Sequence, residues 1–195
     1  MGAKPQLKAS DAIAELSGTA YPSYIVGPYK WYTDVAEGAD YVIEDAKAFG
    51  EFAEIVNGTV PAAFDIAQDS FAGKTVVLAD DIDLSSYADW TPIGTSAKAF
   101  AGTFDGAGKA ITGLSITTGG GYKGLFGNSS GTVKDFTVSG SIGKDADGTI
   151  TYVGTRDFYG VVAMNTGTVS GIVSKLNIYP GTGATYSVGG VVGKN

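Results

Sequence analysis

The stretch GLFGNSSGTVKDFTV at residues 124–138 is followed by a related stretch, GVVAMNTGTVSGIVS, at residues 160–174. Each begins with glycine, two apolar residues and a small residue, and each continues through Gly-Thr-Val into spaced apolar positions. A third copy begins at Gly190 and is cut off at Asn195, so the copies begin 36 and 30 residues apart. Self-similarity at such a period is the pattern of a solenoid, in which each repeat forms one coil.

Apolar residues within the repeats predict which side chains face the inside of a coil. They recur with a spacing of three and then two residues, as Ile111/Leu114/Ile116, Val133/Phe136/Val138 and, with Ser174 in the third place, Val169/Ile172. We expect these side chains to stack on the coil below, at the ~4.8 Å spacing of paired strands. Glycine favours tight corners, and 22 of the 30 glycines lie after residue 100. Residues 75–195 are therefore interpreted as Gly-rich β coils that continue beyond the end of this chain.

The N-terminal region, residues 1–74, has a different pattern. A short strand is predicted at residues 41–43, and a helix is predicted at about residues 45–56. Phe49, Phe52, Ala53 and Val56 fall on one face of this helix. Asn57-Gly58 supplies the left-handed stop that ends many helices. We interpret the helix as a cap that covers one end of the β coils, within one continuous domain.

Several motifs in order resemble the GLUG-repeat modules of bacterial cell-surface proteins, which also occur beside IgA-protease-type catalytic regions. They cover roughly residues 29–195 and are found at residues 81–84 (DIDL), 90–94 (WTPIG), 100–106 (FAGTFDG) and 124–127 (GLFG). The chain departs from the family at Ala107 and Lys109, where Asn and His are common, and at Ala163, where Gly is usual. The resemblance implies a mostly β fold, a right-handed parallel β-helix, displayed outside the cell in adhesive or spacer roles, and it carries over no catalytic site.

Composition excludes several classes of function. The net charge of −7 and the single arginine, Arg156, leave no basic surface for nucleic acid or for an anionic membrane. No apolar run is long enough to insert into a membrane. The chain has no histidine and no cysteine, which excludes Ser-His and Cys-His catalysis and imidazole or thiolate metal sites. We therefore expect a protein that is not an enzyme.

Aromatic residues of the N-terminal region are the first candidate site. Exposed Tyr and Trp rings stack on sugars, so a glycan could bind the cluster formed by Tyr21, Tyr24, Tyr29, Trp31 and Tyr32. The alternative is that the cluster packs over the capping helix and closes the end of the solenoid. Trp90, which lies in a family motif, is expected in the core.

Three carboxylates are the second candidate site. Asp80, Asp81 and Asp83 could bind calcium, which takes several oxygen ligands, and calcium is the only cofactor that the sequence suggests. Alternation along a strand places Asp81 and Asp83 outward when Ile82 and Leu84 point inward. The alternative is a solvated face without a ligand.

Three functions follow from these features. The first is a non-catalytic surface module that acts as a structural spacer or in cell adhesion, contacting host or cell-wall glycans or surface proteins. The second is a glycan-binding module that uses the aromatic cluster. The third, a polysaccharide lyase or hydrolase, rests on fold analogy alone. Because the last repeat is cut off, we also expect further coils in the parent protein and end-to-end self-association of this fragment.

Overall fold

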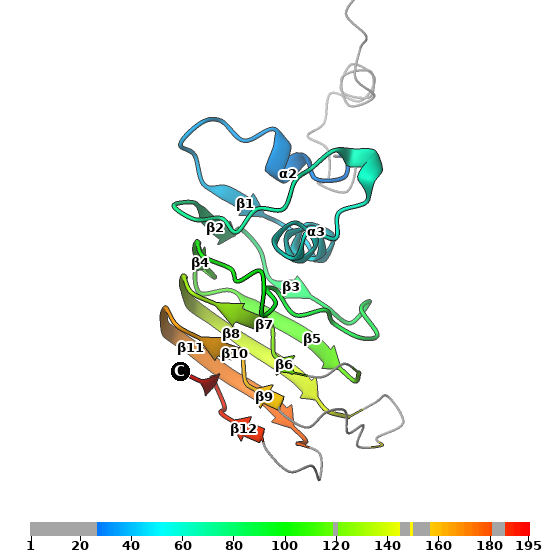
Figure 1. Ribbon diagram of the computed structural model, residues 1–195, viewed down its shortest axis with the longest axis vertical. Helices are drawn as coiled ribbons and strands as arrows, with labels where there is room; N and C mark the ends of the chain where they lie inside the picture. Colours follow the sequence, from blue (N-terminus) through cyan, green and yellow to red (C-terminus); the bar gives the residue numbers. More distant parts are fainter. Residues whose placement is uncertain (1–26, 119–120, 145–148, 150–156, 181–185) are drawn as a thin grey trace, which may run out of the picture.

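The computed structural model describes residues 27–118, 121–144, 149, 157–180 and 186–195. Short strands make up most of the secondary structure, and every paired set of strands runs parallel. Figure 1 shows these strands lying one above another along the long axis of the molecule. The prediction of a mostly β fold is confirmed.

The largest sheet contains seven strands. Its order is β1 (Tyr41–Ile43), β2 (Thr75–Leu78), β4 (Thr103–Asp105), β8 (Thr132–Ile142), β5 (Ala110–Ile116) and β3 (Ile82–Asp83), and β11 (Thr168–Ile178) pairs with β8. The first half of β8 pairs with β4 and its second half pairs with β5. One long strand therefore lies beside two shorter strands. The predicted strand at residues 41–43 is present as β1 and belongs to this sheet.

Two smaller sheets contain the remaining strands. One is formed by β7 (Phe126–Ser129), β10 (Val162–Asn165) and β13 (Val192–Lys194), and the other by β6 (Tyr122–Lys123), β9 (Asp157–Tyr159) and β12 (Tyr186–Val188). In the first of them, Val162 lies between Phe126 and Val192. Equivalent positions of the three sequence copies are therefore paired with one another.

The same correspondence holds along β8 and β11. Val133 pairs with Val169, Phe136 with Ile172 and Ile142 with Ile178. The inward apolar side chains of β5 and β8 are buried, as the spacing predicts, whereas the equivalent side chains of β11 are only half-buried. Among the described strands, β11 pairs with β8 alone, so its other edge is uncovered.

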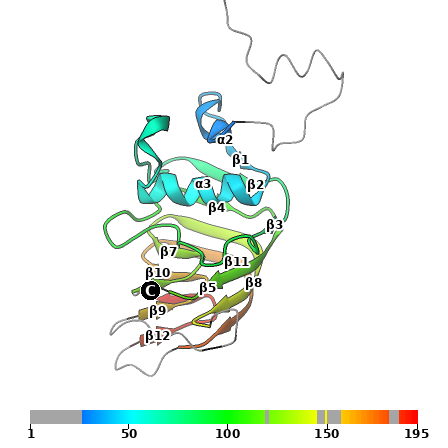
Figure 2. The same ribbon diagram turned by 90° about the vertical axis from the view of Figure 1, so that its right-hand side faces the viewer.

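Helix α3 (Ala46–Asn57) lies across the opposite end of the strands, as Figure 2 shows. Its bounds agree with the prediction to within one residue. The Asp45 carboxylate accepts a hydrogen bond from the Ala48 N–H at 2.8 Å and caps the first turn. Gly58, with φ of 62°, ends the helix in the left-handed conformation that the sequence predicts.

Phenylalanines from the helix and from the strands meet in one hydrophobic core. Phe52 of α3 stacks on Phe104 of β4, and Phe49 stacks on Trp90 with ring centroids 5.3 Å apart. Trp90 is 3% exposed, which confirms its predicted place in the core. The apolar face of α3 thus covers one end of the same core that the strands enclose.

Gly102, Gly131 and Gly167 lie against one another in successive segments of the backbone. A Cβ added to Gly131 would lie 2.0 Å from the carbonyl oxygen of Gly102, and one added to Gly167 would lie 2.0 Å from that of Gly131. No side chain fits at such a distance, so the repeated Gly of the Gly-Thr-Val turn is required by the close approach of successive backbone segments.

Candidate functional site

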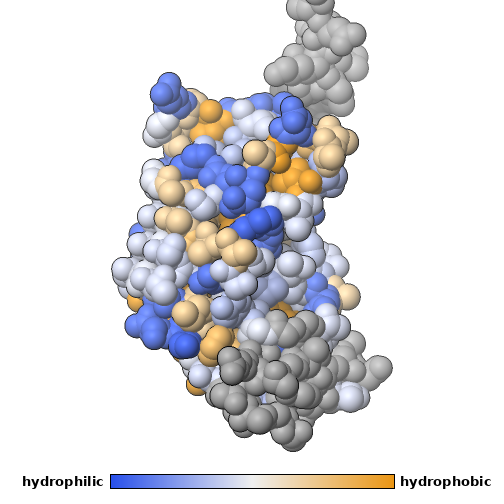
Figure 3. Space-filling view, viewed as in Figure 1, coloured by the Kyte–Doolittle hydropathy of each residue, from blue (hydrophilic) through white to orange (hydrophobic). Residues whose placement is uncertain are grey.

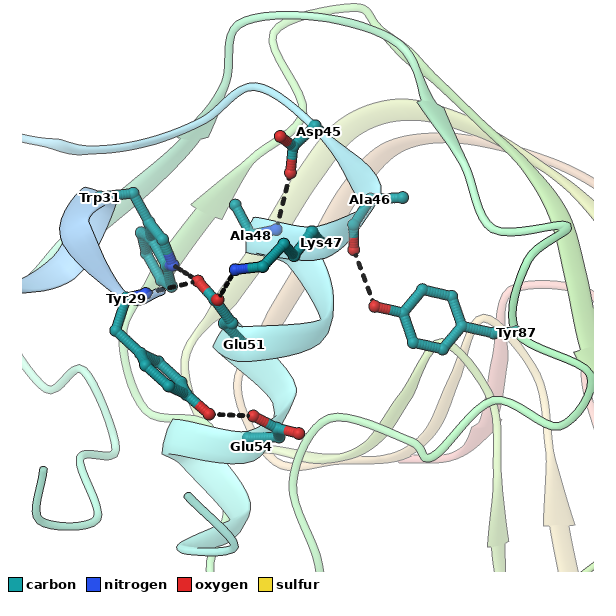
Figure 4. Close-up of polar contacts among 9 residues, drawn as sticks. All are labelled: Tyr29, Trp31, Asp45, Ala46, Lys47, Ala48, Glu51, Glu54 and Tyr87. Atoms are coloured by element: carbon teal, nitrogen blue, oxygen red, sulfur yellow. Dashed lines mark hydrogen bonds and ion pairs between the residues drawn. The ribbon is translucent and has the colours of Figure 1, made fainter. Parts of the chain in front are cut away.

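The outward face of α3 and the short segments beside it form the most distinctive polar region that the structure describes. Helix α2 (Lys30–Thr33) precedes it in the chain, and the 3₁₀ helix η2 (Ala62–Phe64) follows it. Figure 4 shows the polar contacts on this face, and Figure 3 shows hydrophobic surface at the same end of the molecule. Two cavities open on either side of the helix.

Glu51 is the central polar residue of this face. It is 7% exposed, and one of its carboxylate oxygens accepts hydrogen bonds from the Tyr29 N–H at 2.9 Å and from Trp31 Nε1 at 3.0 Å. The other oxygen forms an ion pair with Lys47. A buried carboxylate with three donors holds α2 against α3.

The aromatic residues predicted as a glycan site are mostly involved in packing. Tyr29 is 4% exposed, and its hydroxyl donates to Glu54. Trp31 is half-buried and stacks on Phe71, with ring centroids 6.3 Å apart. Tyr32 is also half-buried and donates to Asp69 at 2.8 Å. These contacts agree with the alternative interpretation, in which the cluster packs around the capping helix. Tyr21 and Tyr24 lie outside the described residues.

The first cavity, which we call the Trp31 cavity, has a volume of about 430 Å³. Apolar atoms of Trp31, Val35, Val42 and Ala48 line it. Five carboxylates and two ammonium groups stand around it, from Asp34, Asp40, Glu44, Asp45, Glu51, Lys30 and Lys47. The half-buried Trp31 side chain therefore lines a cavity beside several carboxylates.

The second cavity, which we call the Tyr87 cavity, has a volume of about 560 Å³ and lies on the other side of the helix. Its lining includes the aromatic residues Tyr29, Phe64, Tyr87 and Trp90 and the carboxylates Glu51, Glu54 and Asp89. Burial raises the pKa of Tyr87, and the negative charges of Glu54, Glu51 and Asp45 raise it further. Burial and the hydrogen bond to Glu54 likewise raise the pKa of Tyr29. Both tyrosines are therefore neutral donors in a negative electrostatic environment.

The three aspartates of the predicted calcium site are not brought together around a common point. Asp81 accepts a hydrogen bond from the Ala110 N–H at 2.8 Å, and Asp83 accepts one from the Ser85 N–H at 2.9 Å. Both are exposed while Ile82 and Leu84 are buried, as the alternation predicts. Asp80 is exposed as well. Among the described residues, no group of three carboxylates is placed to hold a metal ion, so the geometry does not support a calcium site here.

Sequence reasoning missed Glu51, Glu54, Phe64 and Tyr87. The helical pattern does place Lys47, Glu51 and Glu54 on the face opposite the buried phenylalanines, so this polar face could have been derived from the periodicity. Tyr87 carries no such signal, because it reaches α3 from a loop far along the chain. Phe64 carries no such signal either, because its ring meets that of Tyr29, 4.9 Å away between centroids, from the opposite side of α3 in the sequence.

Comparisons with known proteins give no match to a family model, to a curated protein or to a solved structure. The resemblance to GLUG-repeat modules therefore rests on the sequence motifs alone. In the part of the chain that the structure describes, no helix is both long and apolar enough to span a membrane.

Proposed function

We propose that this chain is a non-catalytic module of a bacterial cell-surface protein, folded as a right-handed parallel β-helix and used as a stiff spacer or in adhesion. The observation that carries the proposal is the in-register parallel pairing of successive sequence copies, from Phe126 through Val162 to Val192. Strands paired in this way advance by ~4.8 Å per coil, so each added repeat lengthens the module by a fixed step.

The large hydrophobic core supports a stiff rather than a flexible connection. Apolar side chains from the strands and from α3 form one continuous cluster, so bending between coils would separate packed surfaces. The GLUG-like motifs support placement outside the cell, and the absence of histidine and cysteine supports a role without catalysis.

Distances between spin labels test the stiffness. The chain has no native cysteine, so Ala72→Cys and Val173→Cys, both at exposed positions, introduce one label near each end. A rigid spacer gives one narrow distribution of distances between the labels. A broad distribution, in protein whose circular dichroism and thermal unfolding match those of the parent, would contradict the proposal.

Glycan binding at the Trp31 cavity is the second candidate function. It is favoured by an indole ring that lines a cavity beside several carboxylates, which can accept hydrogen bonds from sugar hydroxyls. The first test is a screen of the purified protein against a glycan array that includes host mucins and cell-wall polysaccharides. Replacing Trp31 would also remove its bond to Glu51, so the site is better blocked at its rim.

Ala39→Trp fills part of the Trp31 cavity from an exposed position and leaves the core intact. A glycan that binds in this cavity should lose affinity for Ala39→Trp and keep it for Ala97→Trp, an exposed substitution outside the cavity. Equal binding by both variants would place the glycan elsewhere, and the absence of any bound glycan would leave the spacer as the only supported function.

A further inference from the structure

The Tyr87 cavity is built from segments that the sequence keeps far apart. Its floor is formed by Gly50, Ala53 and Glu54 of α3, and the Tyr87 side chain lies directly above Gly50. One wall contains Tyr29 and Phe64, and the other contains Tyr87 and Trp90. Figure 4 shows Tyr29 and Tyr87 approaching the helix from opposite sides.

Aromatic rings are concentrated on both walls. The rings of Tyr87 and Trp90 meet edge to face with centroids 5.3 Å apart, and those of Tyr29 and Phe64 lie 4.9 Å apart. Tyr29 and Trp90 are buried, at 4% and 3% exposed, whereas Phe64 is 42% exposed, so Phe64 is the ring most open to a ligand. The faces of aromatic rings carry partial negative charge and attract cations.

Glu54 and Asp89 of the cavity provide negative charge that no ion pair with a described residue offsets. Glu54 accepts from the neutral hydroxyl of Tyr29. Asp89 accepts from the N–H groups of Thr117 and Thr118, at 2.7 and 3.3 Å, and from the Thr118 hydroxyl. Lys47 is the only cationic residue of the lining that the structure describes, and it pairs with Glu51.

Only some ligands match this combination. A metal ion would need several oxygen ligands around one point, and the described residues offer no such group. A neutral apolar ligand would leave the charges of Glu54 and Asp89 without a counter-charge. An ammonium group that carries alkyl substituents satisfies both features, because its charge faces the carboxylates and its carbon atoms contact the exposed ring of Phe64 and the half-buried ring of Tyr87.

We propose that the Tyr87 cavity binds an organic cation, a small ligand bearing an alkylammonium group. This site lies across α3 from the Trp31 cavity and does not depend on the spacer or glycan functions proposed above. A cavity of about 560 Å³ accommodates a trimethylammonium group together with part of the molecule that carries it.

The test uses choline and its neutral isostere 3,3-dimethylbutan-1-ol as probes. The chain has two tryptophans, so its NMR spectrum contains two indole N–H signals, one from each side of α3. Choline should shift the Trp90 signal in a saturable way and leave the Trp31 signal nearly unchanged. The neutral isostere should bind about tenfold more weakly, because it has the same shape without the charge.

Two variants locate the binding energy. Glu54→Gln removes the charge while keeping an acceptor for the Tyr29 hydroxyl, and Phe64→Ala removes an exposed ring. Each should weaken choline binding about five- to tenfold without lowering the melting temperature greatly. Asp80→Asn, which removes one negative charge from an exposed position outside the cavity, should leave it unchanged.

Three results would overturn the proposal. The first is no saturable shift of the Trp90 signal at choline concentrations up to about 100 mM, since an affinity weaker than this is not specific binding. The second is equal affinity for choline and for its neutral isostere. The third is unchanged affinity in both folded cavity variants.

Discussion

Gly50 stands in the middle of α3, where glycine costs about 0.5–1 kcal/mol relative to alanine. Glycine is required at position 50 because Tyr87 approaches the helix there from a distant loop. A Cβ at position 50 would lie 2.1 Å from the Tyr87 hydroxyl oxygen, which donates to the carbonyl of Ala46 at 3.1 Å. The helix therefore gives up some intrinsic stability so that the tyrosine can reach its backbone.

This contact makes the effect of Gly50→Ala depend on Tyr87. In the parent chain, we expect Gly50→Ala to lower the free energy of unfolding by about 1–2 kcal/mol, because the tyrosine must move out. In a Tyr87→Ala background the same change should raise it by about 0.5–1 kcal/mol through helix propensity alone. Chemical denaturation of the four proteins measures both effects. The same sign in both backgrounds would contradict the explanation.

Ala107 is a second residue whose backbone conformation is unfavourable for its residue type. Its φ is 48°, and its N–H donates to the Asp105 carboxylate at 2.8 Å. Asparagine tolerates this left-handed conformation better than alanine. We expect Ala107→Asn to raise the free energy of unfolding by about 0.5 kcal/mol, measured by denaturant titration. Ala97→Asn, at an exposed position outside the set of positive φ values, is the control and should give no gain.

At the scale of elements, the segment between η2 and β2 is fixed to α2 by one carboxylate. Asp69 accepts from the Phe71 N–H and from the Tyr32 hydroxyl, each at 2.8 Å, and pairs with Lys74. Burial alone would raise the pKa of Asp69, but the bonds from Lys74, Phe71 and Tyr32 outweigh it and hold the pKa below its usual range. The same contact and burial raise the pKa of Tyr32 to about 12.

A lowered carboxylate pKa makes stability depend on pH in a definite direction. Asp69 binds its proton more weakly in the folded state, so its contribution is complete above pH ~4 and is lost as the pH falls through the folded pKa. We expect Asp69→Asn to cost about 1 kcal/mol at pH 7 and the difference from the parent to shrink below pH ~4. Urea unfolding at a series of pH values measures this difference. A difference that stays constant down to pH ~2 would show that the charge of Asp69 is not the cause.

Elements with a periodic pattern could be predicted from the sequence, and those held by distant contacts could not. The helix at 46–57 follows from Phe49, Phe52 and Val56 on one face and from Gly58 at its end. Inward positions of β5 and β8 follow from their spacing. By contrast, α2 is four residues long and depends on Glu51, which lies twenty residues further along the chain. Short segments carry too few residues for a pattern, so tertiary contacts decide them.

The candidate sites show the same division. The sequence points to Tyr29 and Trp31 by their density, yet the hydrogen bonds to Glu54 and Glu51 turn much of that cluster inward. The Trp31 cavity is lined by α3 and by segments that precede it, and the Tyr87 cavity is lined also by segments that follow it. The lining of the Tyr87 cavity depends on how distant segments return to one helix, which local patterns do not encode.

Over the whole molecule, the two ends differ. Helix α3 covers one end, where the core residues beneath it are buried. At the other end Val169, Ile172, Leu176 and Ile178 are only half-buried. Their partners one repeat earlier, such as Val133 and Phe136, are buried. The uncovered edge of β11 thus combines free backbone groups with apolar side chains, which is the surface on which strands associate.

This asymmetry predicts a limited self-association. Core side chains are covered by α3 at one end and only half-buried at the β11 end, so two copies can bury apolar surface by meeting at the β11 end, whereas a filament would require the end covered by α3 to pair as well. We expect analytical ultracentrifugation to show monomer at low concentration and dimer, without larger species, as the concentration rises.

Ser174→Lys places a charge at the half-buried position that pairs with Val138, and it should abolish the dimer. Val42→Lys adds the same charge at the α3 end and should leave the dimer intact. Monomer at every concentration, or continued growth beyond the dimer, would show that the uncovered edge of β11 does not control association.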